Sequence, residues 1–219
     1  FKTFLPDKND QKSIRYQKIS SIIQDQDGIY WIGLFEKGFQ CFDATKNIFY
    51  NLKLHTPCND SAFVFNLMED AENNIWIGLD KGIVKTNSTR DGFTEYKFNK
   101  DDSTGLSNDE AQCFFLDKQK RVWIGTKNGL NLYESKTNTF KKYFRENGLY
   151  SDFINSLSQD SKDNIWVSTT NSVCVLNPES GKIKVYKNIS AAFINCDSSG
   201  KVIIGSGGGS TNFITCNDG

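Results

Sequence analysis

The sequence contains little proline, almost no histidine and no paired cysteines. Three prolines, one histidine and six cysteines occur among 219 residues. With one histidine and no C-x-x-C pair, a zinc site is not expected. No apolar run approaches the roughly 18–20 residues that cross a bilayer, so no membrane span is predicted within these residues.

The sequence also has no excess of positive or negative charge. Lys plus Arg and Asp plus Glu both total 26, and no basic cluster stands out. Proteins that bind a nucleic-acid backbone depend on clustered Lys and Arg, so this class is not expected. We expect the cysteines to be small buried hydrophobic residues rather than a disulfide framework, because all but Cys58 fall in predicted strands. The six are Cys41, Cys58, Cys113, Cys174, Cys196 and Cys216.

The most informative feature of the sequence is a repeat rich in aromatic residues. All four tryptophans occur in one phrase, as YWIGL, IWIGL, VWIGT and IWVST, and a fifth copy reads VIIGS. An Asp precedes each phrase by six residues, where its side chain can cap a tight turn. This turn role, rather than carboxylate catalysis, explains all five. The phrase positions are Trp31, Trp76, Trp123, Trp166 and Ile203, and the Asp positions are Asp25, Asp70, Asp117, Asp160 and Asp197.

Each repeat unit predicts four short antiparallel strands, which we call A to D. Strand A ends at the Asp, strand B carries the Trp, strand C follows a Gly or Ser, and strand D carries aromatic or apolar residues. Four such strands in about 40–45 residues are typical of a β-propeller blade, so the fold class is all-β. The expected blades are 19–52, 62–98, 111–144, 154–187 and an incomplete 191–217, with residues 1–4 as strand D of a preceding blade.

These motifs resemble the two-component-regulator propeller repeat, whose phrase reads D-x-x-[GN]-x-[IL]-W-[IV]-[GS]-[TL]. The segments GLSN at 105–108 and GLYS at 148–151 resemble the family's G-L-P-S/N approach to strand A, without its proline. The resemblance implies the periplasmic sensor region of a Bacteroidetes hybrid two-component histidine kinase. Such regions sense oligosaccharides and control glycan-utilisation genes, and the kinase lies elsewhere in the longer parent protein.

Rings of about seven blades are usual in the family, so we expect these five blades to form an incomplete arc. Residues 1–4 are the one strand that the fifth unit lacks. If five blades closed into a ring, residues 1–4 would pair with residues 213–217. We expect the open arc, because both ends of the sequence fall inside a blade.

The variable segments of the repeat predict where a ligand would bind. The D–A connections at 6–18, 53–62, 99–110 and 145–153 are long, whereas the A–B turns are short and uniform. Variable loops on a rigid scaffold are where recognition usually occurs. Aromatic, amide and charged side chains in them suit a sugar, and the candidate ligand-binding residues are Tyr16, His55, Asn59, Asp101, Asn108, Arg145, Tyr150 and Asp152.

Two other functions remain open from the sequence. The propeller could be a scaffold for protein interaction, including a homodimer through the parent ectodomain, or a propeller lyase or glycosidase. An enzyme needs converging carboxylates or a histidine-centred site, and the sequence offers neither, so we expect no catalytic residue, metal or cofactor in this region. A concave aromatic and polar pocket on the D–A loops would favour sugar binding, and a broad apolar patch would favour a scaffold.

Overall fold

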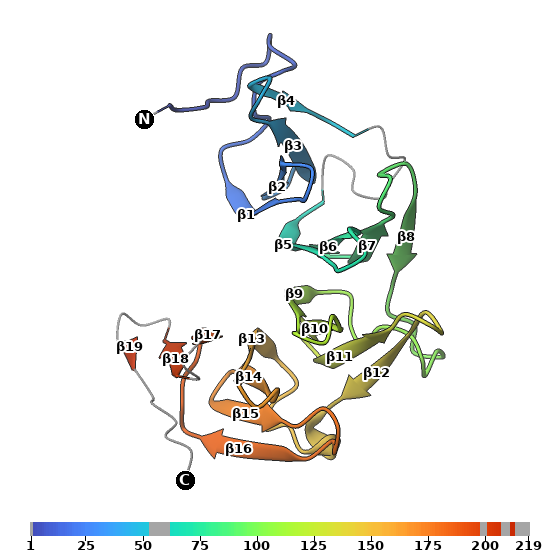
Figure 1. Cartoon of the computed structure of the whole chain (residues 1–219), viewed down its shortest axis with the longest axis vertical. Helices are drawn as coiled ribbons and strands as arrows, with labels where there is room; N and C mark the ends of the chain where they lie inside the picture. The colour runs from blue at the N-terminus through green and yellow to red at the C-terminus, as the bar shows by residue number, and fades with distance from the viewer. Residues whose placement is uncertain (1, 53–61, 198–200, 207–210, 213–219) are drawn as a thin grey trace. The chain divides into compact units, whose positions relative to one another are not determined.

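The computed structural model describes residues 2–52, 62–197, 201–206 and 211–212. Residues 211 and 212 are described by their backbone alone. Within these residues the chain is all-β, as predicted, and its one helix is the short 3₁₀ turn η1 (Arg145–Asn147) (Figure 1). The chain divides into two compact units. The first comprises residues 1–97 and 109–111, and the second comprises residues 98–108 and 112–219.

The first unit contains two four-stranded antiparallel sheets, which we call blades 1 and 2. Neighbouring strands follow the chain in both, in the orders β1-β2-β3-β4 and β5-β6-β7-β8. The strands of blade 1 are β1 (Ile19–Gln24), β2 (Ile29–Leu34), β3 (Phe39–Asp43) and β4 (Ile48–Tyr50). Those of blade 2 are β5 (Val64–Glu69), β6 (Ile75–Leu79), β7 (Gly82–Thr86) and β8 (Phe93–Tyr96).

The second unit contains blades 3 to 5, although Ala111 at the start of β9 belongs to the first unit. Blades 3 and 4 have four strands in chain order, and blade 5 has three described strands. Blade 3 consists of β9 (Ala111–Leu116), β10 (Val122–Thr126), β11 (Gly129–Glu134) and β12 (Thr139–Tyr143). Blade 4 consists of β13 (Ile154–Gln159), β14 (Ile165–Thr169), β15 (Ser172–Leu176) and β16 (Ile183–Lys187). Blade 5 consists of β17 (Phe193–Cys196), β18 (Val202–Gly205) and β19 (Thr211–Asn212).

The repeated Asp closes the turn between strands A and B, as predicted. In each blade its Oδ1 accepts the backbone N–H four residues later, from Ile29, Asn74, Arg121, Asn164 or Lys201, at 2.8–2.9 Å. The structure adds a second role for this carboxylate. In blades 1 to 4 its Oδ2 accepts the indole Nε1–H of the Trp six residues later, at 2.7–2.8 Å. One carboxylate therefore shapes the turn and satisfies the only polar atom of a buried tryptophan.

The tryptophans lie in the core, with Trp31, Trp76, Trp123 and Trp166 at most 5% exposed. In the first unit Trp31 packs with Val64 and Leu67 of blade 2. In the second unit Trp123 packs with Ile154 and Leu157 of blade 4, and Trp166 packs with residues of blade 5. At these junctions within each unit, residues in or just before strand A of one blade thus pack against the tryptophan of the blade before it.

The glycine two residues after the tryptophan allows this close approach. A Cβ added to Gly33 would lie 2.7 Å from Val64, and one added to Gly125 would lie 2.6 Å from Ile154. Blade 4 has Ser168 at the equivalent position, and the following segment has the smaller Ala191 in place of Val64 or Ile154. The repeat therefore needs Gly where the next strand A begins with a branched residue.

The expected strand over residues 1–4 is not found among residues 2–4, and residue 1 lies outside the described part. Side-chain contacts hold this segment instead of a backbone ladder. Phe4 packs edge-on against Phe42 and Phe49 with ring centroids 5.1 and 5.2 Å apart, and Lys2 donates to Asn47 at 2.5 Å. Residues 213–217, its expected partner in a closed ring, lie outside the described residues, so the open arc stays a prediction.

Candidate functional site

The D–A loops and the B–C turns share one edge of each unit, joined by a repeated hydrogen bond. Gly38, Gly82 and Gly129 end the B–C turns of blades 1 to 3 with φ of 64°, 114° and 114°. Their N–H groups donate to the carbonyls of Ala62, Asp109 and Asp152 at 2.7–2.9 Å. Each acceptor precedes strand A of the next blade. Positive φ favours glycine here, so the scaffold fixes the base of the loops that the sequence singles out.

The candidate ligand-binding residues predicted from the sequence are divided between the two units. His55 and Asn59 lie outside the described residues. In the first unit, Tyr16 donates its hydroxyl to Glu36 at 3.3 Å. In the second unit, Asp101 is exposed and Asn108 is half-buried.

One loop does bring three of the candidates together. The backbone N–H of Arg145 donates to Asp152 Oδ1 at 2.7 Å. Tyr150 is 38% exposed and its ring lies 5.8 Å from Lys187 Nζ. These contacts order the loop. The six candidates that the structure describes do not line the two cavities at the segments 6–15 and 190–192.

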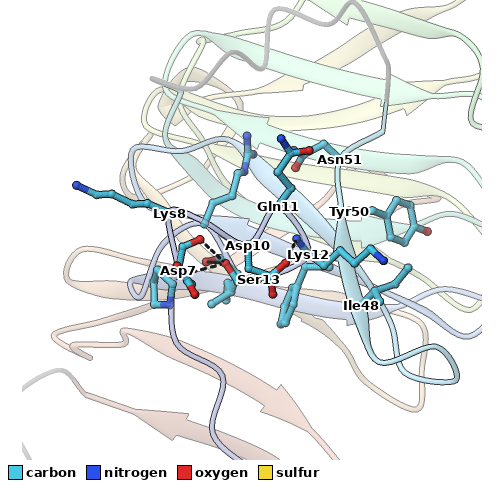
Figure 2. A pocket seen from close by; sticks show the side chains of 13 residues that line it. Asp7, Lys8, Asp10, Gln11, Lys12, Ser13, Ile48, Tyr50 and Asn51 are labelled. Atoms are coloured by element: carbon cyan, nitrogen blue, oxygen red, sulfur yellow. Dashed lines mark hydrogen bonds between the residues drawn. The ribbon is translucent and has the colours of Figure 1, made fainter.

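A cavity of about 640 Å³ lies in the first unit, between the segment 6–15 and the segment 48–51 (Figure 2). Its polar side chains are largely engaged in shaping the segment itself. Asp7 Oδ1 accepts the N–H of Asn9 at 2.9 Å, Asp10 Oδ1 accepts that of Lys12 at 2.8 Å, and Ser13 Oγ donates to the Asp7 carbonyl. The dashed bonds in Figure 2 join Asp7, Asp10 and Ser13 to one another or to their neighbours. Two successive Asx turns therefore account for these residues.

The loop before blade 3 has the same architecture, which supports this structural interpretation. Asn99 and Asp102 take the places of Asp7 and Asp10, accepting the N–H groups of Asp101 at 3.0 Å and Thr104 at 2.8 Å. Both loops then pair with strand D of the blade that follows. Phe49 N–H donates to the Lys12 carbonyl, and Phe140 N–H donates to the Thr104 carbonyl. A feature repeated in both units is better explained by folding than by a specific ligand.

A second cavity, of about 580 Å³, lies at the loop edge of the second unit. Half-buried Gln112, Phe153 and Asn155 line it, buried Ala191 lies among them, and exposed Thr170, Ser190 and Ala192 lie at its rim. No charged side chain is among its lining residues. Aromatic, amide and hydroxyl groups without charge can bind a neutral ligand by stacking and hydrogen bonding.

A strand irregularity occurs at Asn155, one of the two amides that line this cavity. The pairing of β13 with β14 slips between Ile154 and Ser156, so Asn155 is the bulged residue. Equivalent slips occur at Ser20 and Phe65 in the first unit. Bulges redirect a side chain and recur beside functional sites. Gln112 occupies the corresponding position of β9, one residue after Ala111.

The two amides differ in their hydrogen bonding. Asn155 Nδ2 donates to the Ala191 carbonyl at 3.0 Å, which fixes its orientation. Gln112 Nε2 is buried and has no hydrogen-bond partner among the described residues. A buried donor without a partner costs about 1–3 kcal/mol. It therefore marks a position where a hydrogen-bond acceptor from outside the chain would be stabilising.

The buried thiols offer no nucleophile at this edge. Burial raises the pKa of Cys41 and of Cys113 to about 12, and it also raises that of Cys174. A thiol with such a pKa stays protonated at neutral pH and is inert. Cys41, Cys113, Cys174 and Cys196 lie in strands β3, β9, β15 and β17, as the sequence predicts.

Reasoning from the sequence missed the residues of the second cavity because they belong mostly to strands or strand ends. It selected loop residues, whereas Gln112 and Asn155 lie within strand A. One signal was present. Both follow the small or branched residue that begins strand A, at a position occupied by Ser20 and Phe65 in blades 1 and 2.

The repeats and their geometry match a known family. A model of the two-component regulator propeller matches residues 105–128 and 151–171, in blades 3 and 4 and the loops before them. These two segments match the two-component regulator propeller repeat. Each match includes the Asp-capped turn and buried tryptophan described above, and the second match also includes Phe153, Asn155 and Thr170 of the second cavity.

Similar proteins agree with this family. Histidine kinase P4 of Formosa agariphila is 29% identical over 66% of this chain and 13% of its own length. The extracellular domain assigned to one hybrid two-component system of B. thetaiotaomicron superposes with a TM-score of 0.73 and 20% identity. The match covers 92% of this chain and 30% of that one. A virginiamycin B lyase of Staphylococcus aureus has a TM-score of 0.66 and 15% identity, over 90% of this chain and 70% of that one.

These structural likenesses establish the β-propeller fold. The chain spans 13% of the histidine kinase and 30% of the B. thetaiotaomicron domain. Among the described residues, no helix is long and apolar enough to cross a membrane.

Proposed function

We propose that this chain is an extracytoplasmic sensor segment of a hybrid two-component system that binds an oligosaccharide. The observation that carries the proposal is the family match over 105–128 and 151–171, which includes D–A loop residues and strands A and B of blades 3 and 4. The relative named histidine kinase and the B. thetaiotaomicron extracellular domain of similar fold support the same assignment. Binding at this edge would regulate kinase and response-regulator domains of the parent protein and so control glycan-utilisation genes.

An array of plant, algal and host oligosaccharides tests the binding part of this proposal. We expect the purified, labelled chain to bind a restricted set of related oligosaccharides, and soluble forms of the same sugars to compete. Uniform weak signal on all of them, or no signal above that of an unrelated propeller, would contradict the proposal.

A scaffold function remains a second candidate because of the exposed apolar residues on β1. Ile19 and Ile22 are 45% and 53% exposed, whereas Val64 and Leu67 at the same positions of β5 are at most 3% exposed. In blade 2 these positions are covered by a neighbouring blade, so the face of β1 suits a similar partner. If this surface causes self-association, sedimentation velocity should show dimers that Ile22→Lys dissociates.

A further inference from the structure

We infer that the cavity formed by Gln112, Phe153, Asn155, Thr170 and the segment 190–192 is a binding site for an uncharged sugar, with Gln112 Nε2 as a ligand-directed donor. The inference rests on the proposed function, because it names the site and the chemical class of the same ligand. It adds a restriction that the family assignment lacks: acidic and sulfated sugars are excluded.

The first argument is the unsatisfied donor. Gln112 Nε2 is buried and has no hydrogen-bond partner in the part of the chain that the structure describes, whereas Asn155 Nδ2 donates to the Ala191 carbonyl at 3.0 Å. The two amides at equivalent strand positions therefore differ in that Asn155 Nδ2 already donates one hydrogen bond, whereas both N–H groups of Gln112 Nε2 are available to an incoming acceptor. Sugar hydroxyl and ring oxygens are neutral acceptors of the required kind.

The second argument is the form and charge of the cavity. Phe153 is half-buried in its wall and supplies an apolar ring against which C–H groups of a pyranose can pack, while Thr170 and Ser190 place hydroxyls at the rim. A volume of about 580 Å³ lies in the range of small-molecule sites. An anion would enter this site without a cation to compensate for its desolvation, which is costly.

The third argument is the rigidity of the site. Ile154, which lies in the chain between the lining residues Phe153 and Asn155, and the lining residue Ala191 belong to apolar clusters of blades 3 to 5. Ser156 Oγ accepts the N–H of Ile194 at 3.3 Å, and Ser158 Oγ accepts that of Cys196 at 2.9 Å, so β13 is tied to β17 beside the site. A preformed site of this kind loses little entropy on binding.

Nuclear magnetic resonance on the full chain tests the inference directly. The Gln112 side-chain amide signals are identified as those absent from the spectrum of Gln112→Leu. The probes are cellotriose, maltotriose and mannotriose as neutral sugars, and trigalacturonate as an acidic sugar. We expect at least one neutral trisaccharide to shift the amide signals of Gln112 and Asn155, and trigalacturonate to leave them unchanged.

Variants then measure the contribution of the donor. Gln112→Leu should weaken binding of that neutral trisaccharide about 5- to 10-fold, as expected for one neutral hydrogen bond. Gln112→Glu should weaken it as well, because it replaces the donor with an acceptor. Gln26→Leu, the same substitution at an exposed residue of an A–B turn that does not line the cavity, is the matched control and should leave the dissociation constant unchanged.

The outcomes separate this inference from the proposed function. If a trisaccharide shifts other signals while those of Gln112 and Asn155 stay fixed, the site is wrong and the sensor function stands. Stronger binding of trigalacturonate at Gln112 would overturn the restriction to neutral sugars. If no trisaccharide shifts any signal and the oligosaccharide array is also blank, both proposals are wrong.

Discussion

Two junctions between blades, that of blades 1 and 2 and that of blades 3 and 4, have the same apolar packing but different polar contacts. Both bury a tryptophan against strand A of the next blade. In both, the N–H after the capping Asp donates to the last side chain of that strand. Gln26 donates to Glu69 at 3.4 Å in the first unit, and Lys118 donates to Gln159 at 2.8 Å in the second.

The carboxylate in the first unit requires a cation, and Arg90 supplies it. The Arg90 side chain is 13% exposed and lies 3.4 Å from Glu69 and 3.5 Å from Asp25, with its guanidinium 5.4 Å from the Trp31 ring centroid. In the second unit, the neutral Gln159 instead donates to Gln119 at 2.8 Å. The same backbone geometry thus tolerates a buried ion pair or an amide. Breaking the ion pair should cost more, because it leaves buried charge uncompensated.

Removing the buried tryptophan should have the largest effect at both junctions. Trp123→Ala and Trp31→Ala should each lower the free energy of unfolding by about 3–5 kcal/mol, as deletion of a buried large aromatic does. Urea unfolding followed by fluorescence or circular dichroism measures this. Tyr150→Ala, on an exposed loop residue, should cost under about 1 kcal/mol. A much smaller loss for Trp31→Ala than for Trp123→Ala would show that the two junctions are not equivalent.

Removing the cation should separate the two junctions. Arg90→Met should cost about 3 kcal/mol, because Glu69 and Asp25 would stay buried without a counter-charge. Lys118→Met in the second unit should cost under about 1 kcal/mol, since the Lys118 side chain is 58% exposed. Adding Glu69→Gln to Arg90→Met should recover part of the loss, because Gln159 already occupies this position in the second unit. Additive losses in a double-mutant cycle would argue against the ion pair.

Gln159→Leu should have a smaller effect, about 1 kcal/mol, because it removes one neutral acceptor from the Lys118 N–H. Chemical denaturation of Gln159→Leu and of Gln159→Glu provides the measurement. Gln159→Glu keeps the acceptor but introduces a carboxylate like that of Glu69 without an equivalent of Arg90, so it should cost more than Gln159→Leu. The reverse order would show that Lys118 can supply the counter-charge that Arg90 supplies in the first unit.

The strands and turns of the blades could largely be predicted from the sequence, whereas the cavity around Gln112 and Asn155 could not. The Trp phrase and the Asp six residues before it define strands A and B in every blade, because an in-register repeat must use each residue in the same way. The hydrogen bond from Trp to Asp joins two positions that the sequence had already marked, yet it could not be inferred, because turn capping alone explained the Asp. The cavity around Gln112 and Asn155 lies at the start of strand A, where the only sequence signal is the small or branched residue before each amide, and the bulge at Asn155 has no motif of its own.

The residues 2–4 show a different limit. Their sequence resembles strand D, since Phe1-Lys2-Thr3-Phe4 matches the pattern of Phe140 to Tyr143. Strand formation, however, also requires a backbone partner in the same sheet. Phe4 instead packs on the aromatic side chains of blade 1. Local pattern predicts a strand only where its ladder is available.

The smallest expected effect is a difference in pH dependence between the two units. Burial raises the pKa of Glu69. Its contribution to stability is therefore complete below its unfolded pKa of about 4.3 and is lost as pH rises through the folded pKa. Burial also acts to raise the pKa of Asp160, but hydrogen bonds from Trp166 and Asn164 outweigh it and hold that pKa below its usual range. Its contribution is complete above about pH 3.9 and is lost as pH falls through the folded pKa.

Glu69→Gln and Asp160→Asn should therefore change the pH profile in opposite directions. The free energy of unfolding of each variant is subtracted from that of the parent chain at several pH values between about 3 and 7, where these carboxyls titrate. For Glu69→Gln the difference should decrease as pH rises, because only the parent has a carboxyl that must ionise while buried. For Asp160→Asn it should decrease as pH falls, because only the parent loses a hydrogen-bonded carboxylate. Parallel profiles would mean that the buried charge of the first unit and the capping carboxylate of the second respond alike, and the contrast between the two would fail.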